Sequence, residues 1–200
     1  VALSSQAGNQ AITFWRTGVS PAAPLEYGGR LAFNFPSGFE HTTFALTARE
    51  APGVPGETEV YFNIGAAANS VATPATTVVG LGAAGVSFQP ASLVADSVYR
   101  VRVSDSGTAI AVQPPQLIAT GLRNAAGMAF DAEGDFYLQD NGIDTEGNRD
   151  VSFSADELNR IAAEALGQQV PDFGFANTYV RYSDGVLVNP SPSVTDPLVA

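Results

Sequence analysis

Turn-forming residues punctuate this chain from end to end, with 20 glycines and 13 prolines among 200 residues. The segments between the turns are short, and their apolar residues are mainly Val, Phe and Ala. Because Gly and Pro favour turns and interrupt helices, this pattern predicts many short strands rather than a few long helices. We therefore expect an all-β fold.

The composition supports a folded domain. Apolar residues make up 45% of the chain and charged residues 14%, a balance that provides a sizeable core and excludes intrinsic disorder. The length fits one domain, or at most two small ones. No apolar run approaches the roughly 18 residues of a membrane-spanning helix, so we expect no membrane span.

The charge of the chain restricts its partners. All nine basic residues are Arg, and 20 acidic residues bring the net charge to -11. This charge opposes binding to nucleic acids and to anionic membranes. Acidity without Lys suits a secreted or cation-binding protein, or serves solubility alone. The absence of Cys excludes disulfides, thiolate metal sites and thiol nucleophiles.

Local patterns predict several strands. Apolar and polar residues alternate over residues 97–103 and again over 108–112, with a turn between them, which is typical of a β-hairpin. A second hairpin is predicted over residues 128–139, and a further strand over 59–65. Residues 66–84 are a low-complexity stretch that fits either a long loop or an irregular strand.

A Gly-to-Phe pattern recurs at residues 29–33, 85–88 and 127–130. Phe33 and Phe88 lie 55 residues apart, and Phe88 and Phe130 lie 42 apart. Periods of about 40 to 50 residues are typical of β-propeller blades, which are four-stranded antiparallel sheets. The spacing predicts that the three phenylalanines lie on equivalent strands and face the core, together with Trp15 and Phe62.

One segment favours a helix. Ser154 and Glu157 form a capping box, and the apolar residues that follow have helical spacing up to Gly167. Local propensity alone predicts a helix from about residue 155 to 166.

Five motifs follow one another in the second half of the chain: TGLRNAAGMAF at 120–130, GDFY at 134–137, DNG at 140–142, DELNRI at 156–161 and DFGF at 172–175. In this order they resemble the glucose/sorbosone dehydrogenase family, the soluble quinoprotein sugar dehydrogenases. Upstream, EYGGRLAF at 26–33 and IGAAAN at 64–69 are similar to two further segments of that family. The resemblance extends from about residue 24 to 185.

The resemblance implies a six-bladed β-propeller. At about 45 residues per blade the chain holds about four blades. We expect residues 1–200 to be a single propeller domain that is incomplete at both ends. The family pattern also places residues 157–161 on a strand and leaves only 162–166 helical, which we adopt because tertiary context overrides weak local propensity.

The resemblance also implies a function, the oxidation of a sugar (aldose) hydroxyl by hydride transfer to pyrroloquinoline quinone (PQQ), with Ca²⁺, in the periplasm or outside the cell. PQQ carries three carboxylates, which suit Arg side chains and a hard cation. Arg123 and Asn124 match the pair that contacts the cofactor in the family, whereas Ala126 replaces a polar contact residue. Alternatively, the Arg-Asn turn ties neighbouring blades together through hydrogen bonds to carbonyl groups.

A calcium site is expected in the acidic loop at residues 140–150. Asp140 and Asp144 supply carboxylates, the ligands that Ca²⁺ prefers. The resemblance implies that the carbonyl groups of Gly142 and Ile143 face the Ca²⁺ of the cofactor site. It places Asp156 and Glu157 near a second, structural Ca²⁺. The alternative is an ordinary Asp/Asn/Gly turn.

Glu26 stands where the family has its catalytic His. A carboxylate can act as a general base if burial tunes its pKa; otherwise Glu26 is a solvated loop residue. His41, the only histidine, lies outside the motif. Two classes of function therefore stay open: a PQQ-dependent sugar dehydrogenase, and a non-catalytic, Ca²⁺-stabilised extracellular propeller that serves as a binding or scaffold module.

Overall fold

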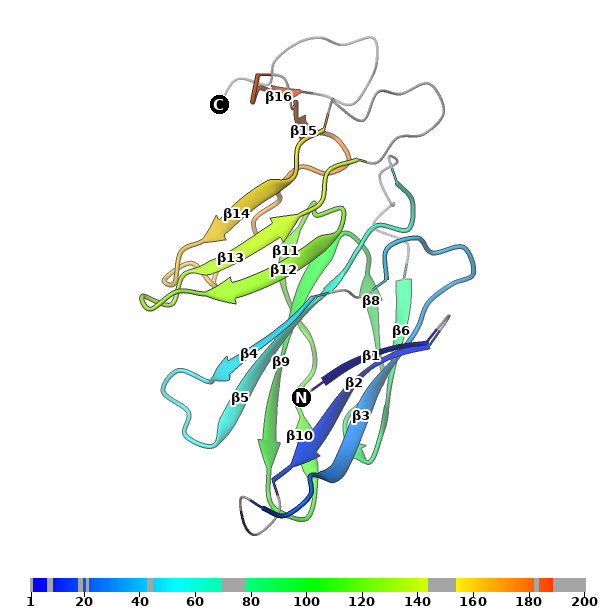
Figure 1. Ribbon diagram of the computed structural model, residues 1–200, viewed down its shortest axis with the longest axis vertical. Coiled ribbons are helices and arrows are strands. Elements are labelled where there is room, and N and C mark those ends of the chain that lie inside the picture. The colour runs from blue at the N-terminus through cyan, green and yellow to red at the C-terminus, as the bar shows by residue number, and fades with distance from the viewer. Residues whose placement is uncertain are drawn as a thin grey trace.

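The computed structural model describes residues 2–6, 9–17, 20, 22–42, 45–69, 78–143, 154–181 and 184–188. The regular elements within these ranges are all β-strands, which confirms the prediction of an all-β fold. This part of the chain has no helix that could cross a membrane. The strands form three sheets and a small two-stranded ribbon (Figure 1).

Sheet A holds five strands, each antiparallel to its neighbours. In spatial order they are β1 (Ala2–Gln6), β2 (Asn9–Arg16), β3 (Glu26–Asn34), β6 (Val78–Ala84) and β8 (Ala91–Val94). The low-complexity stretch therefore ends in a regular strand, β6, and its residues 70–77 lie outside the described part of the chain.

Sheet B packs against one face of sheet A. Its strands are β4 (Leu46–Glu50), β5 (Glu57–Ile64), β9 (Ser97–Asp105), β10 (Ile110–Val112) and β7 (Val86–Ser87), while β11 (Gln116–Thr120) pairs with the first half of β9. All pairs are antiparallel except β7 with β10. The predicted strand at 59–65 and the predicted hairpin at 97–112 are confirmed.

Sheet C consists of three consecutive antiparallel strands, β12 (Ala125–Phe130), β13 (Phe136–Asp140) and β14 (Glu157–Ile161). The ribbon of β15 (Tyr179–Val180) and β16 (Leu187–Val188) follows. The hairpin predicted at 128–139 is confirmed, and so is the strand at 157–161. The helix predicted at 162–166 is wrong, because this segment makes only a turn, in which Leu166 N donates to Ala162 O at 3.1 Å.

Strands from sheets A and B alternate along the chain. Between the neighbouring strands β5 and β9, the chain returns to sheet A for β6, joins sheet B briefly with β7 and enters sheet A again with β8. In the described part of the chain, no sheet is built from four consecutive strands, and the strands do not close into a ring. The predicted four-stranded blades are therefore not found in that simple form.

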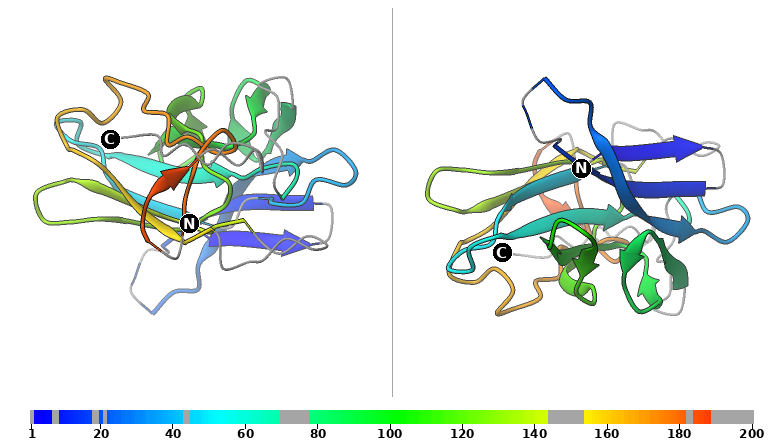
Figure 2. Two further views of the ribbon diagram at one scale, coloured as in Figure 1. Left: turned by 90° about the horizontal axis from the view of Figure 1, so that it is seen from above. Right: turned by 90° about the horizontal axis from the view of Figure 1, so that it is seen from below.

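The three sheets stack face to face, with sheet B in the middle. Figure 1 shows sheets A and C on opposite sides of β4 and β5, and Figure 2 shows the same layers from above and below. The core between sheets A and B is built around Ile12, Leu31, Phe33, Phe62 and Val101. The core between sheets B and C contains Tyr61, Val98, Ile118, Phe136, Leu138 and Ile161.

Strand β5 illustrates how the sequence specifies a middle layer. Val60, Phe62 and Ile64 face sheet A, whereas Tyr61 faces sheet C, and all four are fully buried. A strand that is covered on both faces requires an almost continuous apolar run rather than simple alternation. Six consecutive residues from Glu59 to Ile64 are buried, and four of them, Val60, Tyr61, Phe62 and Ile64, are apolar or aromatic, which meets this requirement.

The predicted equivalence of the three Gly-to-Phe segments is wrong. Phe33 is buried on β3, the third strand of sheet A, and Phe130 ends β12, the first strand of sheet C. Phe88 follows β7 and lies outside any strand. Trp15 was also expected in the core, but it is 44% exposed at the end of β2. The spacing of these three phenylalanines therefore arises by chance, because the three segments do not occupy equivalent positions in the sheets.

The strand registers show a different repeat, between sheets B and C. In sheet B, β5 pairs with β9 so that Ile64 lies opposite Ser97; in sheet C, β13 pairs with β14 so that Asp140 lies opposite Glu157. Aligning these pairs matches ADSVYRV at 95–101 with ADELNRI at 155–161. The alternation of side chains between the two faces also agrees. Val60 and Phe62 of sheet B face sheet A, and their equivalents in sheet C, Phe136 and Leu138, face sheet B.

An acid–arginine pair occurs at the same place in both copies of the repeat. Glu59 binds Arg100 at 2.6 Å, and at the equivalent positions Asp135 accepts from Arg160 Nε at 2.5 Å. In sheet B the pair is part of a larger network. The Glu59 carboxylate, which is fully buried, also accepts hydrogen bonds from Tyr61 and from two further arginines, Arg49 and Arg102.

Candidate functional site

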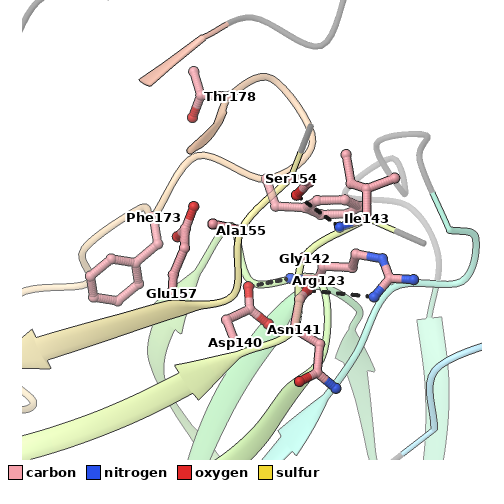
Figure 3. A pocket seen from close by; sticks show the side chains of 11 residues that line it. Arg123, Asp140, Asn141, Gly142, Ile143, Ser154, Ala155, Glu157, Phe173 and Thr178 are labelled. Atoms are coloured by element: carbon pink, nitrogen blue, oxygen red, sulfur yellow. Dashed lines mark hydrogen bonds between the residues drawn. The ribbon is translucent and has the colours of Figure 1, made fainter. Parts of the chain in front are cut away.

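A small pocket lies where β13 and β14 meet the segment that follows them (Figure 3). We call it the strand-end pocket. Its volume of about 20 Å³ is enough for one ion or one water molecule. It is lined by Arg123, Asp140, Asn141, Gly142, Ile143, Ser154, Ala155, Glu157, Phe173, Phe175 and Thr178.

Asp140 is the more buried of the two acids in the pocket, with only 5% of the residue exposed. Its Oδ2 accepts the backbone N–H of Arg123 at 2.9 Å, and its Oδ1 accepts that of Asn124 at 2.6 Å. Burial raises the pKa of the Asp140 carboxyl to about 7, although these two N–H groups act in the opposite direction. The negative charge of Glu157 contributes to this rise in the pKa.

Glu157 lies directly opposite Asp140 in the ladder between β13 and β14. Its Oε1 accepts the N–H of Val180 at 3.2 Å, which connects the pocket to β15. Burial raises the pKa of the Glu157 carboxyl as well. Two neighbouring carboxylates repel each other when both are ionised, and a cation placed between them removes this repulsion.

The loop after β13 is held against the start of β14 by side chains. Gly142 N donates to Asp156 Oδ1, and Ile143 N donates to Ser154 Oγ, both at 2.9 Å. A Cβ atom on residue 142 would lie 2.7 Å from the carbonyl oxygen of Ser154 and 2.8 Å from that of Ala155. Only Gly fits here, and the close approach gathers backbone oxygens beside the pocket.

Arg123 serves as a structural tie between sheets B and C. It is only 2% exposed, and its Nε donates to the carbonyl oxygen of Asn69 at 2.8 Å. Its Nη2 donates to Asn69 Oδ1, and its Nη1 donates to the carbonyl oxygen of Asn141 at 3.4 Å. This arrangement matches the alternative interpretation, in which the Arg-Asn turn joins neighbouring sheets through carbonyl groups.

Asn124 lies next to the pocket but does not line it. The residue is 9% exposed, and its Oδ1 makes no hydrogen bond to the described part of the chain. Its carbonyl oxygen accepts the N–H of Asn141 at 3.2 Å. Ala126, two residues further on, is exposed on β12.

The two candidates for a general base lie outside the pocket. Glu26 is exposed at the start of β3 in sheet A, opposite Arg16. His41 is 9% exposed, and its Nδ1 lies 3.1 Å from the carbonyl oxygen of Ala66, which also accepts the His41 backbone N–H. Glu26 therefore lies in a different sheet from Arg123. His41 lies beside the Arg123 backbone, since a Cβ atom on Gly65 would be 2.7 Å from His41 Cβ and 3.0 Å from the carbonyl oxygen of Arg123.

Most of the acidic-loop candidates do meet in one place. Asp140, Gly142, Ile143 and Glu157, which were expected to serve two separate Ca²⁺ ions, line a single pocket. Asp156 is exposed and reaches only the loop backbone, whereas Asp144 lies outside the described residues. The sequence offered DFGF at 172–175 as a motif but did not indicate that Phe173, Phe175 and Thr178 form a wall of the pocket. No local pattern shows that this segment runs beside the end of β11, where Phe173 N donates to the carbonyl oxygen of Thr120 at 3.0 Å.

The chemistry of the pocket suits a hard cation. It offers two carboxylates together with hydroxyl and carbonyl oxygens, which are the groups that Ca²⁺ takes as ligands. No cluster of three acidic or His side chains occurs among the described residues, so backbone oxygens or water would complete the shell. PQQ does not fit the pocket, because the volume is ion-sized and Arg123 already binds Asn69 and Asn141.

Comparisons of the chain with protein-family models, with curated proteins and with solved structures found no match.

Proposed function

We propose that this chain is a propeller-type module that binds a divalent cation, Ca²⁺ first, in the strand-end pocket, and that it serves as a non-catalytic binding or scaffold module. The cation would be held by Asp140 and Glu157 and would join the end of sheet C to the segment around Val180. The module would thus be stabilised by the cation rather than use it for chemistry.

The propeller-type architecture is supported by the repeat between sheets B and C. The two copies share strand order, register, alternation and an acid–arginine pair, and they stack face to face. Stacked copies of one antiparallel unit are the building principle of propellers. The strands β6 to β8 are then an insertion within the first copy.

A difference between the two copies of the repeat supports the proposal of a cation site. Where sheet C has the facing acids Asp140 and Glu157, sheet B has Ile64 and Ser97, both buried and uncharged. The same backbone arrangement therefore does not require carboxylates at these positions. Burying Asp140 beside the half-buried Glu157 costs free energy unless a partner compensates their charge, and a cation provides this compensation.

Thermal unfolding with and without Ca²⁺ tests the site. Ca²⁺ at about 100 times its dissociation constant should stabilise the fold by about 2.7 kcal/mol, which corresponds to roughly 5–10 °C for a domain of this size. The melting temperature should therefore differ by this amount between millimolar Ca²⁺ and excess EGTA. Asp140→Asn, which keeps an oxygen acceptor for the turn, should abolish the difference.

Asp156→Asn is the matched control for this experiment. It removes a charge from the same loop but not from the wall of the pocket. This variant should keep the full response to Ca²⁺. Identical melting curves of the wild-type protein in Ca²⁺ and in EGTA would contradict the proposal.

A PQQ-dependent sugar dehydrogenase is the second candidate, because Arg123, Gly142 and Ile143, which the resemblance assigns to the cofactor site, line one pocket. Two observations argue against this candidate: Arg123 already binds Asn69 and Asn141, and Glu26 lies in sheet A, away from the pocket. We expect titration of PQQ in the presence of Ca²⁺, followed by quinone absorbance, to give no saturable binding and no dye reduction with aldoses. Saturable binding that Arg123→Ala weakens would favour the dehydrogenase instead.

A further inference from the structure

The outer face of sheet C, which points away from sheet B, carries a large exposed apolar residue. Leu158 on β14 is 72% exposed. Tyr137 and Arg160 lie opposite each other in the same ladder and share this face by alternation. In the described part of the chain nothing packs over Leu158.

The repeat shows that this face has the construction of a sheet-packing surface. Its equivalents in sheet B are Val98 for Leu158 and Tyr61 for Tyr137, and both are fully buried against sheet C. The same register positions are therefore fully buried in sheet B, whereas in sheet C Leu158 is exposed and Tyr137 is half-buried. The outer face of sheet C continues an established interface.

The opposite end of the stack has an exposed aromatic surface. Trp15 and Tyr27 lie opposite each other on β2 and β3 of sheet A and are 44% and 54% exposed, with ring centroids 5.7 Å apart. Leu25, just before β3, is 61% exposed. In the contact between sheets B and C, the partner of the Tyr61 face is likewise aromatic and aliphatic, formed by Phe136 and Leu138.

We infer that two copies of this chain associate head to tail, with the outer face of sheet C in one copy packed on the Trp15–Tyr27 surface of sheet A in the other. The two surfaces differ, so the contact is heterologous; repeated from copy to copy, it gives a ring where the rotation closes and an open row of copies where it does not. Trp and Tyr are enriched at the centres of protein interfaces. This inference does not depend on the cation.

Charge modulates the association. Each copy has a net charge of -11, so the copies repel each other over a distance that salt shortens. An apolar contact between acidic chains should therefore strengthen as the salt concentration rises.

Sedimentation velocity over a roughly hundredfold range of protein concentration tests the inference, because mass action then shifts the monomer–dimer balance. The wild-type chain should form dimers and larger head-to-tail oligomers, whereas Leu158→Asp and Trp15→Asp should each remain monomeric. Val170→Asp is the matched control, since Val170 is 50% exposed but lies in the loop after β14, outside both surfaces, and this variant should still associate. Circular dichroism establishes that the variants are folded.

Mixing the two monomeric variants distinguishes the head-to-tail contact from other arrangements. Leu158→Asp keeps the sheet A surface, and Trp15→Asp keeps the sheet C surface, so the mixture should regain one contact and form a dimer. A wild-type chain that stays monomeric throughout would overturn the inference. So would dimers that Trp15→Asp leaves intact, because sheet C would then pack on sheet C.

Discussion

Replacement of Glu59 by Gln is expected to destabilise the fold by about 3–5 kcal/mol, the cost of breaking a buried ion pair. The Glu59 carboxylate is fully buried and binds Arg49 at 2.9 Å, Arg100 at 2.6 Å and Arg102 at 3.2 Å. Gln keeps the shape but not the charge, so three guanidinium groups would remain close together without a counter-charge. Urea denaturation monitored by circular dichroism gives the change in the free energy of unfolding.

The repeat supplies a control for this prediction. Asp135 occupies the equivalent position in sheet C, but its partner Arg160 is 56% exposed at the side chain and no other arginine pairs with this carboxylate among the described ion pairs. Asp135→Asn should therefore cost far less than Glu59→Gln, because water screens an exposed pair. Equal losses for the two variants would contradict the role of the buried network.

The same network of ion pairs around Glu59 predicts how the stability of the fold depends on pH. Burial raises the pKa of the Glu59 carboxyl, but hydrogen bonds from Tyr61 and Arg49 and the charge of Arg100 outweigh burial and hold it below the ordinary value of 4.5. A depressed pKa in the folded state contributes stability that is fully present above the unfolded pKa. This contribution is lost as the pH falls through the folded pKa, so the wild-type advantage over Glu59→Gln should shrink below pH 4.5.

Truncation of Phe136 to Ala should cost a similar 3–5 kcal/mol, since it opens a cavity between sheets B and C. Phe136 is fully buried, and its ring lies 4.9 Å from that of Tyr61 and 4.7 Å from that of Phe130. Hydrogen exchange of the β13 and β14 amides should also accelerate, because this contact holds sheet C on sheet B. Tyr137→Ala, on the outer face of the same strand, should have a much smaller effect on both readouts.

The fold class could be predicted from the sequence because its evidence is local. Alternation over residues 97–103 and the turn after it specify β9 and β10 without reference to the rest of the chain. The strand at 157–161 was predicted only through the family resemblance, since the capping box of Ser154 favoured a helix. In the structure Ser154 Oγ instead accepts the N–H of Ile143, a contact that no local propensity encodes.

The layer arrangement could not be predicted, because it depends on contacts between distant segments. The insertion of β6 and β8, which join sheet A, and of β7, which joins the far edge of sheet B, separates β5 from its neighbour β9 and conceals the period of the repeat. The pair of strings ADSVYRV and ADELNRI was a usable signal, and it lies 60 residues apart rather than near 42. Spacing of Phe alone could not reveal it, since phenylalanines occupy different positions in the copies.

The candidate site could be predicted only in part, because some of its contacts join residues that are distant in sequence. The oxygen-rich loop that begins at Asp140 was recognisable because its carboxylates lie close together in sequence, whereas Gly142, Ile143 and Glu157 followed from the resemblance. The engagement of Arg123 by Asn69 was not foreseeable, because it joins residues 54 positions apart. A sequence motif names a residue type but does not tell whether its donors are already used.

Calorimetric titration of the chain with Ca²⁺ measures directly whether the strand-end pocket binds a cation. We expect one saturable site per chain that is lost in Glu157→Gln and in Asp140→Asn but retained in Asp156→Asn. Mg²⁺ should bind more weakly, because it demands a stricter octahedral shell than a pocket of mixed oxygens offers. Absence of binding, or binding that survives loss of both pocket carboxylates, would contradict the account.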